Sequence, residues 1–247
     1  MPGFRPTLIP TLFTVPALLV LVALGVWQVE RLAWKTRLID TIDSRIHADP
    51  VPLPPLGALD PNQWEYRRVI VRGVLRNDKE MHLLAYTERG NLGYHLIVPL
   101  IPLARDGAGA VLVDRGWVPA AQKAPASRPQ SQPEGVVNIE GVVRKPWGRG
   151  WFVPENDPAE NLWFYPDVAA MAASAGVAVP PLLIEAGPAP NPGGLPIGGQ
   201  TVVDVPNHHL QYALTWFGFA IALAVIYVLY HRRLEDERSR QGEEKLP

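Results

Sequence analysis

The chain has 247 residues, a formal net charge of −1 at pH 7 and no cysteine. The charge balance argues against a nucleic-acid-binding protein, and the lack of cysteine excludes disulfides, thiolate metal sites and cysteine nucleophiles. The length suits one folded domain together with two membrane spans, and such a domain can form a hydrophobic core without covalent crosslinks.

Two apolar segments lie near the ends of the chain, and we predict that residues 8–29 and 207–230 are transmembrane helices. About 20 apolar residues are needed to cross a hydrocarbon core of about 30 Å. The first segment exceeds the apolar run of a signal peptide and no small-residue cleavage site follows it, so we expect a retained anchor. Residues 30–48 repeat apolar side chains every four positions, which predicts that the first helix continues beyond the membrane.

Lysine and arginine residues indicate the orientation, because cytoplasmic flanks of membrane spans are enriched in them. Four arginines follow the second span between residues 232 and 240, whereas neither residue type lies between residue 149 and that span. We therefore predict cytoplasmic segments at 1–7 and 231–247 and a periplasmic domain at 49–206, on a bacterial inner membrane. The first span has the opposite bias, although a smaller one, which suggests that Arg31 and Lys35 serve another purpose.

Between the anchors the sequence predicts a strand-rich domain, in which short alternating segments are separated by Gly, Asn and Asp. Such strands predict an antiparallel sheet that curls towards a barrel, without indicating whether it closes. One soluble helix is predicted at Ala169–Ala175, before Gly176. The fold class is therefore an α+β membrane protein, with two transmembrane helices flanking a β-rich, barrel-like antiparallel domain that holds one or two short helices. The predicted strands are Tyr66–Arg76, Glu80–Tyr86, Tyr94–Leu103, Ala110–Val118, Val136–Val143 and Leu182–Glu185.

Conventional catalytic motifs are absent from the sequence. No serine lies in a Gly-x-Ser-x-Gly elbow, and there is neither a phosphate-binding glycine loop nor a His-Glu-x-x-His helix. His82 and His95 each stand alone in a predicted strand and are interpreted as structural histidines. A metal-dependent enzyme would need a convergent set such as His82, His95 and Asp114, and nothing in their spacing brings them together. We therefore expect a protein that is not an enzyme.

Two histidines, His208 and His209, stand where the second apolar segment begins. If the helix begins with Asn207 as its cap, His209, Tyr212 and Trp216 share one face. Polar groups at this depth are costly unless they are paired or used. On spacing alone an interfacial aromatic belt is the simpler interpretation, since Tyr and Trp favour this depth.

The first span offers a second polar and aromatic surface at the same boundary. Gln28, Arg31 and Lys35 share one face of the helix, and Trp27 and Trp34 flank it. A neutral imidazole, flat aromatic side chains and nearby cations suit a haem group, because iron binds an imidazole nitrogen and propionates bind Arg or Lys. This constellation is not a motif, and by itself it does not identify a haem protein.

Five segments follow one another in a fixed order along the chain. They are Gly25–Arg31 (GVWQVER), Val113–Pro119 (VDRGWVP), Phe152–Pro158 (FVPENDP), Gly198–Thr201 (GGQT) and Asn207–Phe217 (NHHLQYALTWF). In these segments, and over nearly its whole length, the chain resembles the Surfeit locus protein 1 family, the assembly factors of haem-copper cytochrome c oxidase.

The resemblance implies a two-span assembly factor that acts on the large catalytic subunit of the oxidase while haem a is inserted. It also implies transient binding of haem a by the histidine that aligns with His209, with His208 as the alternative iron ligand. We expect Tyr212 and Trp216 to flank the macrocycle and Arg31 or Lys35 to meet a propionate. The expected partners are the large oxidase subunit, haem a synthase and membrane lipid. The alternative is a membrane-anchored scaffold that stabilises the oxidase subunit by protein contact without binding haem.

Overall fold

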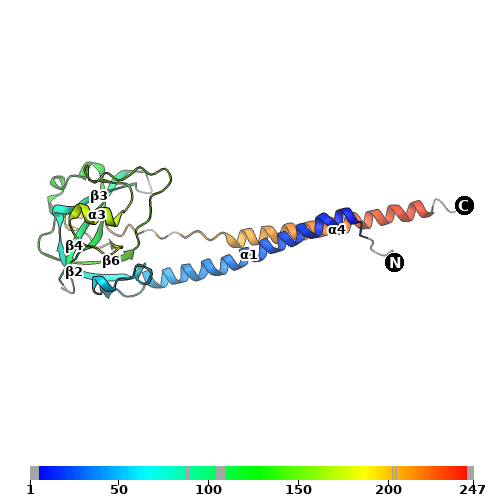
Figure 1. The fold of residues 1–247 in the computed structure, drawn as a ribbon, viewed down its shortest axis with the longest axis horizontal. Helices are drawn as coiled ribbons and strands as arrows, with labels where there is room; N and C mark the ends of the chain where they lie inside the picture. The colour runs from blue at the N-terminus through cyan, green and yellow to red at the C-terminus, as the bar shows by residue number, and fades with distance from the viewer. Residues whose placement is uncertain (1–5, 87–89, 104–108, 202, 204, 244–247) are drawn as a thin grey trace. The chain divides into compact units, whose positions relative to one another are not determined.

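The computed structural model describes residues 6–86, 90–103, 109–201, 203 and 205–243, without the side chains of 239 and 241–243. The chain divides into two compact units. The helical unit comprises Met1–Thr41 and Asp204–Pro247, and the barrel unit comprises Ile42–Val203. Figure 1 shows the two long helices of the first unit and the sheet of the second.

The helical unit is built from α1 (Leu8–Ile46) and α4 (His209–Glu243). Their most apolar stretches reach mean hydropathies of 2.3 in α1 and 2.1 in α4. Both helices are therefore long and apolar enough to cross a membrane, and the chain is a membrane protein. The 39 residues of α1 form one continuous helix, which at about 1.5 Å per residue is about 58 Å long and exceeds the hydrocarbon thickness.

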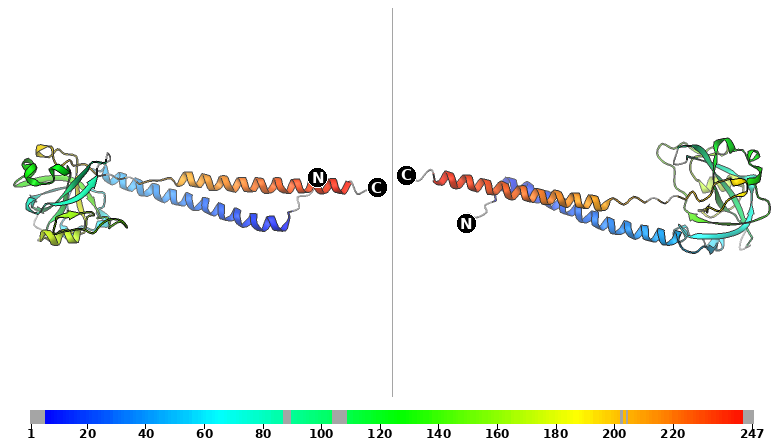
Figure 2. Two further views of the ribbon diagram at one scale, coloured as in Figure 1. Left: turned by 90° about the horizontal axis from the view of Figure 1, so that it is seen from above. Right: turned by 180° about the vertical axis from the view of Figure 1, so that it is seen from behind.

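The two helices run antiparallel, because residue numbers rise along α1 where they fall along α4. Gln28 hydrogen-bonds His209, Thr11 hydrogen-bonds Tyr227, and the Thr7 backbone hydrogen-bonds His231. Figure 2 shows the pair from two further directions. We call the contact surface between the helices the seam. Its residues on α1, together with Thr7 just before the helix, alternate steps of four and three residues, which is the spacing of coiled-coil packing: Thr7, Thr11, Thr14, Leu18, Leu21, Gly25 and Gln28.

The barrel unit closes, which the sequence left open. Five strands form a ring in the order β2–β6–β8–β5–β4, and pairing of β4 with β2 completes it. Strands β3 and β7 extend the sheet beyond β4, and β1 extends it beyond β2. The pairs β1–β2, β3–β7 and β5–β8 are parallel, and the other pairs are antiparallel. The strands are β1 (Val51–Pro52), β2 (Arg68–Leu75), β3 (Met81–Tyr86), β4 (Leu92–Pro102), β5 (Val111–Pro119), β6 (Val136–Arg144), β7 (Leu162–Trp163) and β8 (Leu183–Ala186).

Short helices connect and cover the strands. Helix α3 (Val168–Ala175) begins where Asp167 accepts a hydrogen bond from the Ala170 backbone, and it ends at Gly176 in the left-handed conformation. This agrees with the predicted soluble helix within one residue. The other short helices are α2 (Pro61–Trp64) and the 3-10 segments Leu56–Ala58, Asn77–Lys79, Ala120–Gln122, Pro125–Ser127, Pro129–Ser131 and Pro192–Gly194.

Alternation along the strands separates two hydrophobic clusters. One fills the barrel interior and includes Val71, Val98, Val113 and Ile184. The other lies where α3 covers the opposite face of the sheet, through Met171. Strand side chains point alternately to the two faces, so these strands are apolar on both sides where α3 covers them.

Closure of the ring depends on a residue without a side chain. Gly73 of β2 pairs with Pro102 of β4 and with Val137 of β6. A Cβ atom at Gly73 would lie 2.3 Å from the backbone oxygen of Ile101. The two strands can therefore approach closely enough to pair only because position 73 is glycine.

We expect Gly73→Ala to lower the free energy of unfolding by about 1–3 kcal/mol, since the backbone of β4 must move to admit the methyl group. Thermal unfolding of the barrel, followed by far-ultraviolet circular dichroism, measures the change. Gly57→Ala is the matched control, because a Cβ atom at Gly57 meets nothing within 4 Å. Equal unfolding midpoints for the two variants would contradict this account of closure.

Candidate functional site

The candidate site lies in the helical unit, where Gln28 of α1 meets His209 of α4. The Gln28 side chain is buried, with 8% of the residue exposed, and His209 is half-buried. His209 Nδ1 lies 2.7 Å from Gln28 Oε1. An amide oxygen can only accept, so the imidazole donates Nδ1–H and a neutral ring keeps its lone pair on Nε2. Among the described residues, no partner contacts that Nε2 by a hydrogen bond.

The prediction that Asn207 caps the second helix is wrong by one residue. The His208 carbonyl accepts the first helical hydrogen bond, from the Tyr212 backbone at 3.3 Å, so His208 is the N-cap. Asn207 does not cap α4 because its amide reaches across the seam and donates to Thr36 Oγ1 at 3.4 Å. Its Oδ1 is buried, and none of the described residues bonds it.

The two neighbouring histidines have different environments. His208 is exposed, whereas His209 lies on the seam. Trp216, two turns further along α4, is also half-buried and packs edge-on against Phe219 at a ring separation of 6.2 Å. Tyr212 is 55% exposed. The structure therefore places His209 and Trp216 towards α1, and His208 and Tyr212 on the outer surface of the helix pair.

The two predicted cations lie on α1 within about two turns of Gln28. Arg31 is exposed, and its guanidinium carbon lies 4.0 Å from the centre of the Trp34 ring. Lys35 is half-buried and lies two turns beyond Gln28 on α1. Arg31 and Lys35 therefore lie on the same stretch of α1 as Gln28, but not on one strip of it.

Small residues bring the two helices together next to this site. A Cβ atom at Gly25 would lie 2.6 Å from the Phe217 ring, and Ala213 and Ala220 of α4 are buried. Small side chains allow close backbone approach between membrane helices. The short hydrogen bond between Gln28 and His209 depends on this approach, because neither side chain is long enough to span a wider gap.

The residues considered for an enzyme site in the barrel unit separate into a pair and a single histidine. His95 Nδ1 lies 2.7 Å from Asp114 Oδ2, which sequence spacing did not suggest. The sequence did not reveal this pairing because it depends on a bulge between His95 and Ile97. The bulge shifts the register of β4 against β5 and brings the two side chains together. Among the residues that the structure describes, no three His, Asp or Glu side chains lie close enough together to hold a metal ion.

His82 belongs to a different, structural cluster, as the sequence predicted. Its Nε2 bonds Glu80 Oε1 at 2.9 Å, and its Nδ1 accepts from Asn161 at 3.4 Å. Arg128 pairs with both oxygens of Glu80 and is itself buried. Burial raises the pKa of Glu80, but hydrogen bonds from His82 and Arg128 outweigh it and the pKa is lowered. This cluster attaches the proline-rich loop before β6 to the sheet.

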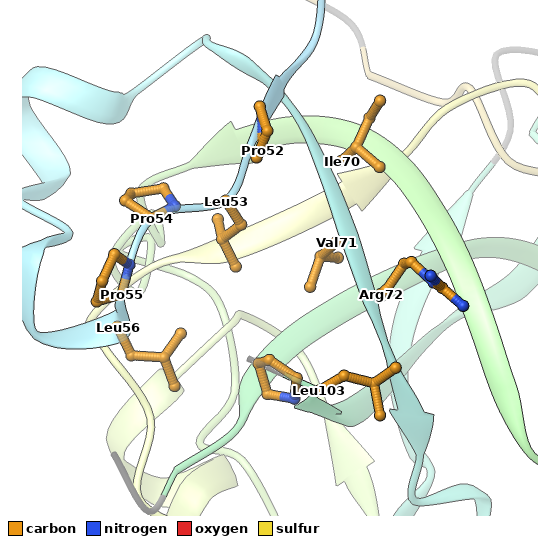
Figure 3. A pocket seen from close by; sticks show the side chains of 10 residues that line it. Pro52, Leu53, Pro54, Pro55, Leu56, Ile70, Val71, Arg72 and Leu103 are labelled. Carbon is orange, nitrogen blue, oxygen red and sulfur yellow. The ribbon is translucent and has the colours of Figure 1, made fainter. Parts of the chain in front are cut away.

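The barrel also carries an apolar groove of about 460 Å³ between the proline-rich segment after β1 and the neighbouring strands. Figure 3 shows Pro54, Pro55 and Leu56 on one side and Val71 and Leu103 on the other. Arg72 is the charged residue of its lining. This groove offers shape and apolar surface but no pair of chemically reactive groups.

A model of the SURF1 family matches residues 15–221, a range that contains both Gln28 and His209. The chain belongs to the SURF1 family. It is 38% identical over 220 residues to Surfeit locus protein 1 of Xenopus tropicalis, covering 83% of this chain and 70% of that protein. The human Surfeit locus protein 1 is 38% identical over 219 residues, covering 83% and 71%. A SURF1-like protein of Monosiga brevicollis is 35% identical over 220 residues, covering 85% and 83%. These matches confirm the resemblance inferred from the sequence.

The seam of this SURF1-family chain can be tested by crosslinking, since the chain contains no cysteine. We expect Gln28→Cys combined with His209→Cys to be joined efficiently by a short bis-maleimide in membranes. The control combines Val29→Cys with His209→Cys, because Val29 is exposed beside Gln28 on the same helix. Gel mobility after proteolysis between the helices measures the yield. Equal yields from the two pairs would show that the helices do not meet along this seam.

We also expect His95 to titrate above its ordinary value of about 6.5. Burial lowers the pKa of His95, but the charge and hydrogen bond of Asp114, together with the charge of Glu185, raise it above that value. The protonated ring is therefore favoured by folding, so its stabilising contribution is present below pH 6.5 and is lost as pH rises through the folded-state pKa. Histidine NMR resonances measure the titration, and Asp114→Asn should lower the pKa. A His95 pKa at or below 6.5 in the unsubstituted chain would contradict the pairing.

Proposed function

We propose that this protein is an assembly factor for haem-copper cytochrome c oxidase that holds haem a transiently through His209 and assists its insertion into the large oxidase subunit. The supporting observation is the hydrogen bond from His209 Nδ1 to buried Gln28. Beyond membership of the SURF1 family, this assigns His209 the role of a haem ligand.

The bond to Gln28 suits an iron ligand. A metal-binding histidine generally donates its second ring nitrogen to an acceptor, which fixes the tautomer and the direction of the ring. Gln28 does this for His209, so Nε2 is the nitrogen that remains for iron. A bound haem a would supply an iron that accepts this lone pair and propionates that need cations. A single imidazole ligand is compatible with release of the cargo.

Other side chains near this end of the helix pair would assist. Arg31 is exposed and charged, and Lys35 lies one turn further on, so either could bind a propionate. Trp27 and Tyr212 are about half exposed and, with Trp216, offer flat apolar surfaces for a macrocycle. Gln28 and Gly25 would not contact the cargo, because they position His209 from within the seam.

We propose a bacterial inner-membrane location with both termini cytoplasmic and the barrel periplasmic. The arginines after the apolar part of α4 support this orientation. His209 then lies at the periplasmic boundary, where haem a synthase could deliver haem a and the large oxidase subunit could receive it. Membrane lipid surrounds the exposed apolar faces of both helices.

We expect His209→Ala, purified in detergent from cells that make haem a, to lose the haem absorption spectrum. His208→Ala is the matched control and should retain it, because His208 is an exposed cap outside the seam. Gln28→Leu should shift the spectrum and weaken retention, by about 10–100-fold in affinity if Gln28 acts as a supporting partner. Equal retention of haem by both histidine variants would remove His209 from the role of ligand.

A scaffold that never binds haem is the second candidate, and one observation favours it. At the other end of the seam, His231 accepts a hydrogen bond from the Thr7 backbone and is fully buried. This helix pair therefore uses an imidazole as an interhelical connection elsewhere, and His209 could serve only that purpose. Haem-free protein from haem a-producing cells that still restores oxidase haem content in a deletion strain would favour the scaffold.

A further inference from the structure

Four ionisable side chains cross the outer face of the barrel in one row. His95 on β4, Asp114 on β5, Glu185 on β8 and Arg144 on β6 come from strands that are consecutive in the sheet. Asp114 and Glu185 are directly paired in the β5–β8 register. The residues just before the last three, on β5, β8 and β6, belong to the interior core, so by alternation Asp114, Glu185 and Arg144 face outwards. His95 lies with them because its ring bonds Asp114.

This row is buried although it lies on an outer face. The exposed fractions of the side chains are 8% for Asp114, 14% for Glu185, 16% for Arg144 and 21% for His95. Trp147 and the segment at Gln200 and Thr201 complete the walls of a cavity of about 220 Å³. Charged side chains are rarely buried to this extent without partners, so each polar atom in the row needs a partner.

The first half of the row is fully paired. Asp114 Oδ2 bonds His95 Nδ1 at 2.7 Å, and Asp114 Oδ1 accepts the Gly116 backbone N–H at 2.9 Å. Both carboxylate oxygens are therefore engaged within the protein. Asp114 orients His95, and the ring atom that remains for the cavity is Nε2.

The second half of the row is only partly paired. Nε and Nη1 of Arg144 and Oε2 of Glu185 are buried without a hydrogen-bond partner among the described residues. Arg144 Nε lies 3.9 Å from Glu185 Oε1, which is too far for a hydrogen bond. The guanidinium is held over the Tyr66 ring, 4.9 Å from its centre. Buried donors with no acceptor are destabilising, so a ligand that supplies acceptors would complete this site.

We propose that this cavity is a binding site for a carboxylate monoanion. Arg144 donates to the bound carboxylate, His95 donates from Nε2 when its ring is protonated, and Glu185 donates once it is protonated. A dianionic phosphate suits the site less, because the carboxylates of Asp114 and Glu185 line the same space. Leu83 and Ala186 also line the cavity and leave room for a short hydrocarbon portion. This inference does not depend on haem binding, since all its residues belong to the barrel unit.

Charge in the cavity makes binding dependent on pH. Burial raises the pKa of Glu185, Arg144, Thr201 and His95 oppose the rise, and Asp114 adds to it, so the pKa stays above its ordinary value of 4.5. An anion bound beside Glu185 raises this pKa further, and binding is therefore accompanied by proton uptake. The raised pKa of His95 acts in the same direction. The affinity of a carboxylate should therefore increase as pH falls, over the range in which the ligand itself stays ionised.

The test uses the full chain in detergent micelles and three ligands of similar shape: propionate, propionamide and n-propylamine. Histidine NMR shifts and the ligand-induced rise in unfolding temperature both report binding. We expect propionate to bind, with affinity rising by up to about tenfold for each unit of pH decrease per proton taken up, and the amide and the amine to bind at least about tenfold more weakly. Equal binding of propionamide, or affinity that rises with pH, would overturn the proposal.

Two variants test whether propionate binds at the row of ionisable side chains. Arg144→Gln should weaken propionate binding by about tenfold or more, whereas the exposed, Asp78-paired Arg76, changed to Gln, should leave it unaltered. Glu185→Gln keeps the shape of the carboxyl group, so it decides the question even if Arg144→Gln does not fold. It should bind propionate at least as tightly above neutral pH and show a weaker pH dependence. Unchanged pH dependence in Glu185→Gln would contradict the assigned role of Glu185.

The carboxylate could belong to a free small acid or to a polypeptide. A short peptide ending in alanine with a free C-terminus, and the same peptide with a C-terminal amide, distinguish these sources. Tighter binding of the peptide acid than of propionate identifies a chain terminus as the ligand, and tighter binding of propionate identifies a small acid. Binding of both the peptide acid and its amide with equal affinity would overturn the carboxylate site.

Discussion

Polar groups inside an apolar helix pair must find partners across it, and this constraint organises the helical unit. Lipid offers no hydrogen bonds, so a buried polar side chain is tolerated only where the facing helix supplies one. Gln28 with His209, Thr11 with Tyr227 and the Thr7 backbone with His231 meet this requirement. Each pair is satisfied in one register only, and a shift of one turn would break all three.

The same requirement distinguishes two charged clusters of the barrel. Around Glu80 and Arg128 every charged group contacts a partner, and Arg128 alone donates to Glu80, Ser131 and backbone carbonyls. A cluster in which every charged group is paired needs no ligand, and its role is to attach the proline-rich loop before β6 to the sheet. Around Arg144 and Glu185 three buried polar atoms have no hydrogen-bond partner in the described part of the chain. The same domain therefore pairs all the charged groups of one buried cluster and leaves polar atoms of another without hydrogen bonds. This contrast supports a ligand-binding role for the second cluster.

Sequence patterns predicted the elements that depend on local periodicity. The two apolar helices, the main strands and α3 follow from hydropathy, alternation and capping residues, and most observed ends lie close to those expected. The exception is α4, which continues to Glu243, well past the expected end at residue 230. Contacts between distant segments did not follow from periodicity. Closure of the barrel needs the β2–β4 pairing at Gly73, and β1 and β7 are two-residue strands within proline-rich or turn-like segments. Neither the β2–β4 pairing nor these two short strands can be recognised from the local sequence.

The site was predictable in part for the same reason. Family motifs and helix spacing singled out His209, Gln28 and Arg31, but not the hydrogen bond that joins the first two. The pairing of His95 with Asp114 depends on a bulge in β4 that cannot be predicted from the residue pattern. The cap at His208 was missed because Asn207, normally a good cap, is used for a contact with the opposite helix.

The hydrogen bond to Gln28 limits the chemistry of His209 in one further respect. Since the Nδ1 hydrogen is committed to the amide, the ring has a single basic atom left to offer. Any group that binds this ring must therefore approach Nε2, and the bond to Gln28 fixes the direction of that approach.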